Sequence, residues 1–339
     1  MFNIRSAPVV DFPVVDLSQT GTSEANRAQA AAWIAETCTK WGFFQVINHG
    51  VPSHLTEQVW SETHRFFGMH RKDKLAILRT RENPRGYYDR ELTKNTRDLK
   101  EVFDFGAVPH PALPDHHPAN HDRVNGYNLW PANLPGFRST MLEYFTACES
   151  LGMQLIELFC LGLGAPADQI SPAFHPSHTG FIRLNFYPLD DPLEADISRQ
   201  VAGLGDMALQ HHSDAGALTI LLQDNVGGLQ VFAMNEWRDV PPMPGAFVIN
   251  TADMMQVWSN DRYRAPLHRV LPVTEEPRYS IPFFFNPSYD YDCAPLQILA
   301  EAEGAHYRPV NWGEFRQLRT DGDYADYGHE VQLEQYRLP

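Results

Sequence analysis

The stretch ALTILLQDNVGGLQVFA, residues 217–233, decides how we interpret the fold. It contains two short runs of β-branched and apolar residues, ALTILLQ (217–223) and LQVFA (Leu229–Ala233), of the kind that favours strands. The residues between the two runs include Asp, Asn and a Gly-Gly pair, which are typical of turns. The stretch therefore predicts two short β-strands separated by a turn.

Similar β-prone segments follow one another from Gly180 onward. Turn residues separate them at roughly 8 to 12 residues, which is the spacing of an antiparallel sandwich or barrel. A doubly wound nucleotide-binding fold is disfavoured, because helices do not alternate with these strands and no Gly-rich phosphate loop is present. The other predicted strands are FIRLNFY (Phe181–Tyr187), AFVIN (246–250), LHRVLPV (267–273) and RYSIPFFF (Arg278–Phe285).

The N-terminal half has a different pattern of apolar residues, with helical spacing in several segments. Apolar residues at helical spacing predict helices over 25–40, 53–67 and 137–163, and a short strand is expected at 14–17. The apolar run WGFFQVINHG (41–50) is β-prone, whereas 84–131 is mostly loop, with short strands near 86–88 and 101–105. We therefore expect an α+β protein whose helical N-terminal region packs on a double-sheet β core.

The composition limits the classes of function. The chain has 339 residues, enough for one catalytic unit with a large core. A formal net charge of −15 is the wrong sign for binding nucleic acid or an anionic membrane surface. The sequence contains neither a signal-peptide pattern nor an apolar span long enough for a membrane, so we expect a cytoplasmic monomer that acts on a small molecule. Free buried thiols in a reducing cytosol are expected for Cys38, Cys148, Cys160 and Cys293.

A candidate metal site begins at His212-Ser213-Asp214, the one His-x-Asp or His-x-Glu in the chain. Residues i and i+2 of an extended segment face the same side, so the imidazole and the carboxylate can converge. Two histidines and one carboxylate bind Fe(II) and leave adjacent coordination positions open. His268, at the start of another predicted strand, is the candidate third ligand.

Two further strands carry polar residues on one face. Arg278 and Ser280 offer a guanidinium and a hydroxyl to one carboxylate, although an edge-strand arginine beside a surface serine gives the same pattern. In RLNFYP (183–188), the residues Arg183, Asn185 and Tyr187 also share a face. Alternatively, Tyr187 packs in the core and Arg183 extends to solvent.

The order of these motifs resembles the isopenicillin N synthase-like branch of the 2-oxoglutarate-dependent dioxygenases, over nearly the whole chain from Phe12 to about Pro295. The matching motifs are NHGV (48–51), RGYY (85–88), RLNFYP (183–188), HSDAGALTILLQD (212–224), GGLQV (227–231), WSN (258–260), LHRV (267–270), RYS (278–280) and FFFNP (283–287).

This resemblance implies a distorted double-stranded β-helix, or jelly roll, with Fe(II) held by His212, Asp214 and His268. It also implies that Arg278 and Ser280 hold the distal carboxylate of 2-oxoglutarate, with Tyr187 and Asn185 lining that site. Two positions depart from the family: His211 precedes the expected ligand, and Ala252 stands where the family usually has glycine.

The implied reaction uses 2-oxoglutarate and O2 to oxidise a small molecule by hydroxylation, desaturation or cyclisation, with release of succinate and CO2. An Fe(II) oxidase or cyclase that does not use 2-oxoglutarate is the alternative. We expect substrate contacts from Tyr87, Arg183, Phe285 and Tyr289. The expected segments are an N-terminal α/β region (1–135), a helix with the jelly-roll core (136–295) and a C-terminal extension (296–339).

Overall fold

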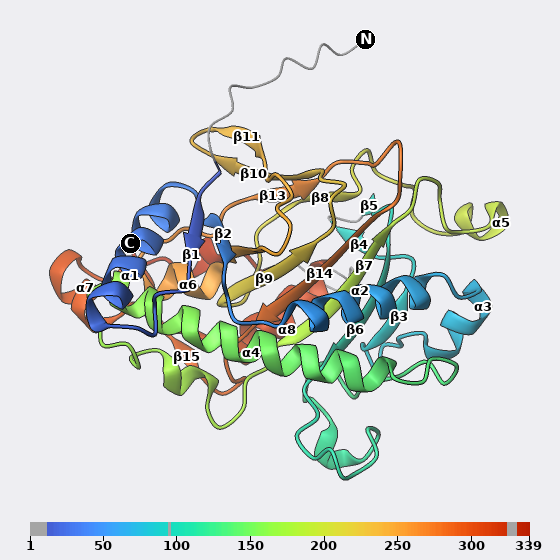
Figure 1. The fold of residues 1–339 in the computed structure, drawn as a ribbon, viewed down its shortest axis with the longest axis horizontal. Coiled ribbons are helices and arrows are strands. Elements are labelled where there is room, and N and C mark those ends of the chain that lie inside the picture. Colours follow the sequence, from blue (N-terminus) through green and yellow to red (C-terminus); the bar gives the residue numbers. More distant parts are fainter. Residues whose placement is uncertain (1–11, 94–95, 324–330) are drawn as a thin grey trace.

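The computed structural model describes residues 12–93, 96–323 and 331–339. Within these residues, the strands form one sheet of eight, one sheet of four and two short two-stranded ladders (Figure 1). The large sheet contains, in spatial order, β1 (Val14–Asp16), β2 (Phe43–Ile47), β12 (Phe247–Thr251), β9 (Leu218–Gln223), β14 (Arg278–Phe285), β7 (Phe181–Tyr187), β6 (Glu101–Gly106) and β3 (Gly86–Tyr88). The small sheet contains β11 (Glu236–Asp239), β10 (Leu229–Ala233), β13 (His268–Val270) and β8 (Leu209–His212). The ladders pair β4 (Leu92–Thr93) with β5 (Thr96–Arg97) and β15 (Asp292–Cys293) with β16 (Val310–Asn311).

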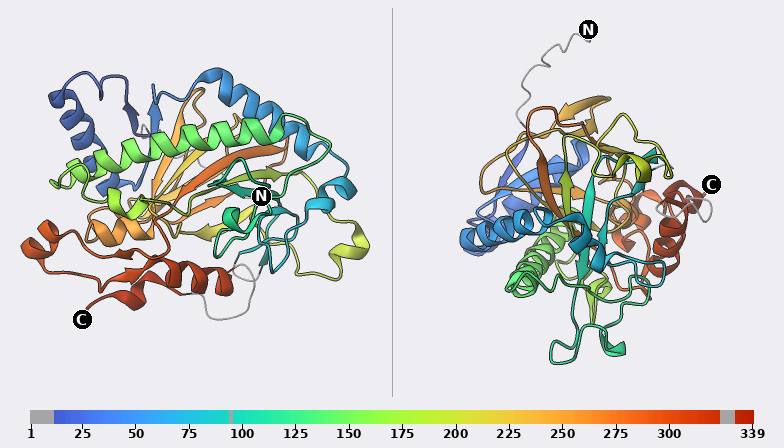
Figure 2. Two further views of the ribbon diagram at one scale, coloured as in Figure 1. Left: turned by 90° about the horizontal axis from the view of Figure 1, so that it is seen from below. Right: turned by 90° about the vertical axis from the view of Figure 1, so that its right-hand side faces the viewer.

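The helices lie around the sheets, with α2 and α4 along one side and α7 and α8 on the other (Figure 2, left). The α-helices are α1 (Glu24–Lys40), α2 (Ser53–Phe67), α3 (Arg71–Lys74), α4 (Phe137–Gly162), α5 (Ala195–Ser198), α6 (Asp253–Trp258), α7 (Gln297–Glu303) and α8 (Trp312–Asp323). Short 3₁₀ turns occur at Leu75–Ile77, Pro118–Asn120, Ser171–Phe174 and Leu333–Tyr336. None of the described helices is both long enough and apolar enough to span a membrane.

The two strands of the opening stretch, β9 and β10, belong to different sheets. β9 pairs with β12 and β14, whereas β10 pairs with β11 and β13. The turn at 224–228 therefore carries the chain from one sheet to the other, and its two glycines, Gly227 and Gly228, have φ values of 87° and 86°. Glycine accepts such positive φ values without the strain that a side chain would bring.

Alternation along β12 shows how the large sheet is buried on both faces. Phe247 and Ile249 join the main core that also contains the buried face of α4, while Val248 between them packs with residues of the small sheet such as Val231 and Val270. Successive side chains of a strand point to opposite faces, so one strand contributes to both layers of the core. Helix α4, with α1 and α2 beside it, covers one face of the large sheet, and the small sheet packs against the other.

Most sequence predictions for individual elements are confirmed, and the helix over 53–67 is matched residue for residue. α1 begins where Ser23 accepts a hydrogen bond from the Asn26 amide, as expected of an N-cap serine. Ala252, the departure from the family pattern, has φ −123° and ψ 179°, extended backbone that alanine adopts without strain. The four cysteines are free and buried, as expected. The sequence did not predict β8, β11 or the helices after residue 250.

Candidate active site

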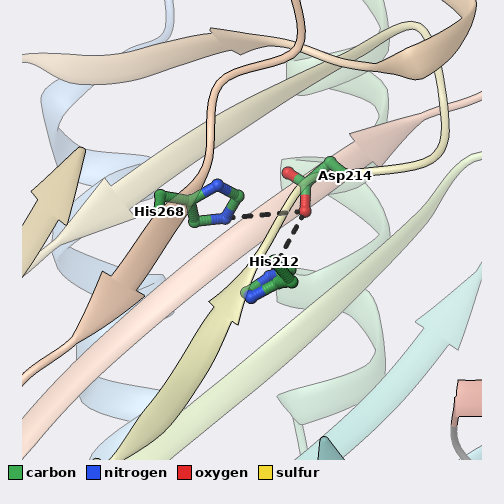
Figure 3. A group of neighbouring side chains, drawn as sticks. All are labelled: His212, Asp214 and His268. Carbon is green, nitrogen blue, oxygen red and sulfur yellow. Dashed lines mark ion pairs between the residues drawn. The ribbon is translucent and has the colours of Figure 1, made fainter. Parts of the chain in front are cut away.

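His212, Asp214 and His268 bring three potential metal ligands together between the two sheets. His212 ends β8, Asp214 lies in the loop that leads to β9, and His268 begins β13, where it pairs directly with His212. The Nε2 atoms of both histidines lie 3.6 Å from Oδ1 of Asp214. Figure 3 shows both rings directed at this one carboxylate oxygen. Two imidazoles and a carboxylate in this arrangement have the composition of a facial Fe(II) site.

Hydrogen bonds hold the three side chains in this orientation. Nδ1 of His212 lies 2.9 Å from the Gln210 carbonyl oxygen, and Nδ1 of His268 lies 3.3 Å from that of Pro266. Each Nδ1 is thus placed to donate to a carbonyl, which leaves Nε2 with a lone pair for a metal. The second oxygen of Asp214, Oδ2, accepts hydrogen bonds from the Thr219 hydroxyl and the Asn250 amide.

The charge states of these residues suit a cation. Burial, together with the neighbouring His268, lowers the pKa of His212 to about 3, so this imidazole is neutral at neutral pH. Burial opposes ionisation of Asp214, but the two hydrogen bonds at Oδ2 help to keep the pKa of this carboxyl below its ordinary value. Metal ligands must be deprotonated, and both groups meet that condition.

A second group of residues adjoins the triad on the large sheet. Arg278 of β14 pairs with Tyr187 of β7, and two residues further along Ser280 pairs with Asn185. The Asn185 amide lies 3.3 Å from the Ser280 hydroxyl oxygen, and the Arg278 guanidinium lies over the Tyr187 ring at 5.0 Å. These four residues and the triad line a cavity of about 80 Å³.

Arg278 has unused hydrogen-bonding capacity inside this cavity. Its side chain is 1% exposed, and its one described hydrogen bond is a long contact of 3.4 Å from Nη2 to Gln223. Nε and Nη1 are buried without a partner among the described residues. β14 lies between β7 and β9, so Arg278 is not an edge-strand arginine. A buried guanidinium with free donors is suited to bind a carboxylate.

A larger cavity, of about 550 Å³, opens on the other side of the triad. His212 and Asp214 line both cavities, as do Arg183 and Phe284. The candidate metal position therefore lies between a small cavity that ends at Arg278 and a large one with room for an organic molecule.

Arg183 is held in a buried network of ion pairs and does not extend to solvent. Its guanidinium donates to both oxygens of Asp104 at 2.7 Å and to Glu91 at 2.7 Å. Glu91 also pairs with Arg79 at 3.0 Å and with Lys100 at 3.7 Å. Burial opposes the ionisation of Glu91, but these three cations hold its pKa well below the ordinary value. The network fixes the position of Arg183, which lines both cavities.

Three residues expected to contact substrate lie outside the lining of both cavities. Tyr87 is completely buried and donates to Glu101 at 2.6 Å. Phe285 is also completely buried and stacks on Phe174 at 4.3 Å. Tyr289 donates to Asp122 at 2.6 Å. Their sequence neighbours Tyr88 and Phe284 line the large cavity instead.

Other residues of the site were not singled out from the sequence. The alternation of side chains along β14 could have indicated Phe284, because residues separated by an even number, such as 278, 280 and 284, lie on the same face of a strand. His211 precedes His212 in β8 and points to the opposite face of the strand. It is exposed and its ring lies 6.4 Å from that of Trp237, as expected for a neighbour of the ligand. Arg85 and Thr219 lie within the quoted motifs RGYY and HSDAGALTILLQD but were given no role there. No local pattern marked the residues that approach from more distant parts of the chain, which are Arg79, Lys100, Asn250, Arg316 and Arg319.

Two family models match the chain. Residues 179–287 match the 2OG-Fe(II) oxygenase superfamily. Residues 12–133 match the N-terminal region described as that of non-haem dioxygenases in morphine synthesis. The first range includes the triad and the Arg278 group, and the second includes most of the helical N-terminal region.

Relatives from several organisms align over most of the chain. Gibberellin 20 oxidase 1 of Arabidopsis thaliana is 32% identical over 320 residues, which cover 94% of this chain and 81% of the relative. The 2-oxoglutarate-Fe(II) type oxidoreductase hxnY of Emericella nidulans is 33% identical over 314 residues, with 88% and 86% coverage. 1-Aminocyclopropane-1-carboxylate oxidase 5 of A. thaliana is 34% identical over 322 residues, with 93% and 92% coverage.

Solved structures of such enzymes superimpose on this one. JOX2 in complex with 2OG, Fe and JA has a TM-score of 0.78 and 28% identity, covering 97% of this chain and 89% of that one. A Neurospora crassa protein in complex with alpha-KG and thymine has a TM-score of 0.76 and 26% identity, with 92% and 96% coverage. These enzymes have a jelly-roll fold. The chain belongs to the 2OG-Fe(II) oxygenase superfamily, in its isopenicillin N synthase-like branch, and is a 2-oxoglutarate-dependent non-haem iron dioxygenase that uses Fe(II), 2-oxoglutarate and O2.

Proposed function

We propose that His212, Asp214 and His268 hold the iron, and that the chain oxidises a small organic molecule with release of succinate and CO2. The observation that carries the proposal is the convergence of both Nε2 atoms on Asp214 Oδ1 at 3.6 Å each. Two imidazoles and one carboxylate would leave adjacent positions open on the metal for 2-oxoglutarate and O2. Iron and O2 supply the oxidising power, and 2-oxoglutarate supplies the second pair of electrons.

The Arg278 group fits the distal carboxylate of 2-oxoglutarate. Nε and Nη1 of Arg278 are buried without partners among the described residues, and leaving such donors unpaired is costly. A carboxylate that accepts from Arg278 and from the Ser280 hydroxyl removes this cost. Tyr187 supports the guanidinium from its ring face, and Asn185 orients Ser280. These contacts would direct the other end of 2-oxoglutarate toward the triad, which lines the same cavity.

The organic substrate would occupy the cavity of about 550 Å³, whose lining includes His212 and Asp214. A volume of this size is typical of sites for small ligands. Similar enzymes were solved with thymine or with JA, which supports a small-molecule substrate. The protein's tasks are to place one C–H bond beside the metal and to keep water away from it. We propose hydroxylation as the outcome, in which one atom of O2 enters the product and the other enters succinate. Desaturation and cyclisation are the alternatives.

We propose the same three segments for the chain as the sequence suggests, with 1–135 and 136–295 supported by the matches at 12–133 and 179–287. The segment 296–339 would complete the site, since α8 contributes to the lining of the large cavity.

A succinate-coupled screen of metabolite extracts tests the proposed function. The purified, iron-loaded protein is incubated with 2-oxoglutarate and each extract, and succinate is measured. We expect one or more extracts to raise succinate formation above the level without extract. The 2-oxoglutarate-independent oxidase or cyclase would instead consume a metabolite and O2 without forming succinate.

A further inference from the structure

Helix α8 forms one wall of the large cavity. Trp312, Arg316, Arg319 and Thr320 all line it, and their spacing of three and four residues places them on one face of the helix. Arg319 is fixed by hydrogen bonds from its guanidinium to the carbonyl oxygens of Val331 at 2.9 Å and Ser213 at 3.2 Å. Because Ser213 stands between two candidate metal ligands, this contact ties α8 to the metal site.

The lining of this cavity is strongly cationic, although the chain as a whole is acidic. The chain has 42 Asp and Glu residues against 27 Lys and Arg. Among the described residues, the cavity is lined by six arginines, and its only carboxylates are Asp104 and the candidate ligand Asp214. A concave site with an excess of one charge attracts small ions of the opposite charge.

Four of the six arginines have a described acidic partner, and a fifth, Arg81, is not without a partner either. Arg79 and Arg183 pair with Glu91 and Asp104. Arg85 lies 3.4 Å from a carboxylate oxygen of Asp122, and Arg319 lies 3.8 Å from one of Asp253. These arginines are therefore at least partly neutralised, and they mainly build the walls of the cavity.

Arg316 differs from them. Its guanidinium makes no ion pair and no hydrogen bond with any described residue. The Phe181 ring lies beside it, with its centroid 5.6 Å from the guanidinium carbon. The side chain is half-buried on the cavity side of α8, so it is partly shielded from water, and none of its donors is used by a described residue. A guanidinium in this position offers a planar, two-donor site for a carboxylate.

The surfaces beside Arg316 are aromatic. Tyr88, Phe181, Phe284 and Trp312 all line the same cavity. Such rings bury apolar or aromatic bodies well.

We propose that the substrate of this enzyme is an organic acid with an apolar or aromatic body, and that Arg316 binds its carboxylate while the body extends toward the metal site. This assignment rests on the proposed function, because it takes the large cavity to be the substrate site. Arg316 acts as a specificity residue, and Arg319 holds its helix in place.

Binding of matched acids and amides tests the assignment. The probes are phenylacetate, 3-phenylpropanoate and 4-phenylbutanoate, each compared with its uncharged primary amide, so that only the charge and its distance from the ring change. Calorimetry measures their dissociation constants on the protein loaded anaerobically with Fe(II). 2-Oxoglutarate is kept saturating so that the probes do not occupy the Arg278 group. The variants are Arg316→Gln, Arg316→Lys and the surface control Arg199→Gln, whose side chain is exposed and pairs with Asp196.

We expect at least one acid to bind the wild-type protein about tenfold more tightly than its amide, equivalent to about 1.4 kcal/mol. Arg316→Gln should abolish this preference, Arg316→Lys should retain part of it, and Arg199→Gln should leave it unchanged. Equal binding of acids and amides by the wild-type protein, or a preference that survives Arg316→Gln, would overturn the assignment. Failure of the proposed function would be recognised separately, as absence of succinate formation from 2-oxoglutarate by the same wild-type preparation.

Discussion

His268 and His212 lie directly opposite each other in the antiparallel pairing of β13 with β8, with ring centroids 4.3 Å apart. This single cross-strand pair brings together ligands from two distant motifs.

Replacing His212, Asp214 or His268 with alanine should abolish succinate formation and weaken Fe(II) binding sharply, because each supplies a third of the fixed ligand set. Iron content after desalting is the measurement.

The matched control for this triad is His211→Ala. His211 adjoins His212 but is exposed and faces the other side of β8, so the variant should retain iron and turnover. An inactive His211→Ala together with an active His212→Ala would mean that the ligand is the other histidine.

Arg278→Lys should raise the KM for 2-oxoglutarate by about tenfold or more, since hydrogen bonds to charged groups contribute roughly 1.5 to 3 kcal/mol and lysine lacks the planar fork. Fe(II) affinity should change little. The control is Arg269→Lys, because Arg269 is also a strand arginine that contacts a glutamine, Gln230, at 2.9 Å, but it does not line either cavity. Steady-state kinetics with varied 2-oxoglutarate measures both variants, and an unchanged KM in Arg278→Lys would argue against the assignment of Arg278.

Thr219→Val removes the hydroxyl that donates to Asp214 Oδ2 at nearly constant volume. We expect Fe(II) affinity to fall by about 10- to 100-fold, the usual effect of losing a contact that orients a metal ligand. Thr251→Val is the control: Thr251 is a buried threonine of β12 whose hydroxyl donates to backbone oxygens away from the triad. Both variants should lose stability, but only Thr219→Val should lose iron affinity in a competition titration with a chelator.

The paired strands β4 and β5 are anchored beside the site by Arg97 and Asp191. The hydrogen bonds from Arg97 are the main reason why the pKa of Asp191 falls to about 2 from its ordinary value of 3.8. A carboxyl with a lower pKa in the folded state stabilises it above the unfolded pKa and loses this effect as pH falls through the folded value. Asp191→Asn should therefore cost about 1 to 2 kcal/mol at pH 7 and clearly less near pH 2.

Urea unfolding at both pH values measures this difference. The control Asp196→Asn changes an exposed carboxylate that pairs with Arg199 at the surface, and it should have almost no effect at either pH. A cost for Asp191→Asn that stays constant with pH would contradict the role of its charge.

Much of the fold follows from short-range sequence patterns, whereas the roles of the triad and of the Arg278 group were inferred from the order of motifs that resembles the dioxygenase family. The period of two placed Arg278 and Ser280 on one face of a strand, and the structure confirms that face. The same alternation places Phe284 on the face of Arg278 and Ser280, and Phe285 on the opposite face. Phe285 lies in the core against Gly152 of α4. A Cβ atom on residue 152 would lie 2.9 Å from the Phe285 ring.

Other parts of the site depend on pairings that no local pattern encodes. β8 has only four residues and a weak apolar alternation, so neither this strand nor its pairing with β13 was evident from the sequence. Arg316 and Arg319 belong to a helix beyond the last matching motif, and their role appears only when α8 lies against the cavity. The buried charges of Glu91 and Lys100 are unusual for a core. They are explained by the ion pair of Glu91 with the distant Arg183 and by that of Lys100 with Asp98.

The most direct test of the central claim is the conversion of 2-oxoglutarate to succinate by the iron-loaded protein without added organic substrate, compared between the wild-type protein and His268→Ala. We predict that the wild-type protein forms succinate slowly and that this activity requires Fe(II) and O2. The activity should be lost in His268→Ala and should persist in the Arg269→Lys control. The claim would be contradicted if the iron-loaded wild-type protein formed no succinate, or if His268→Ala formed it at the wild-type rate.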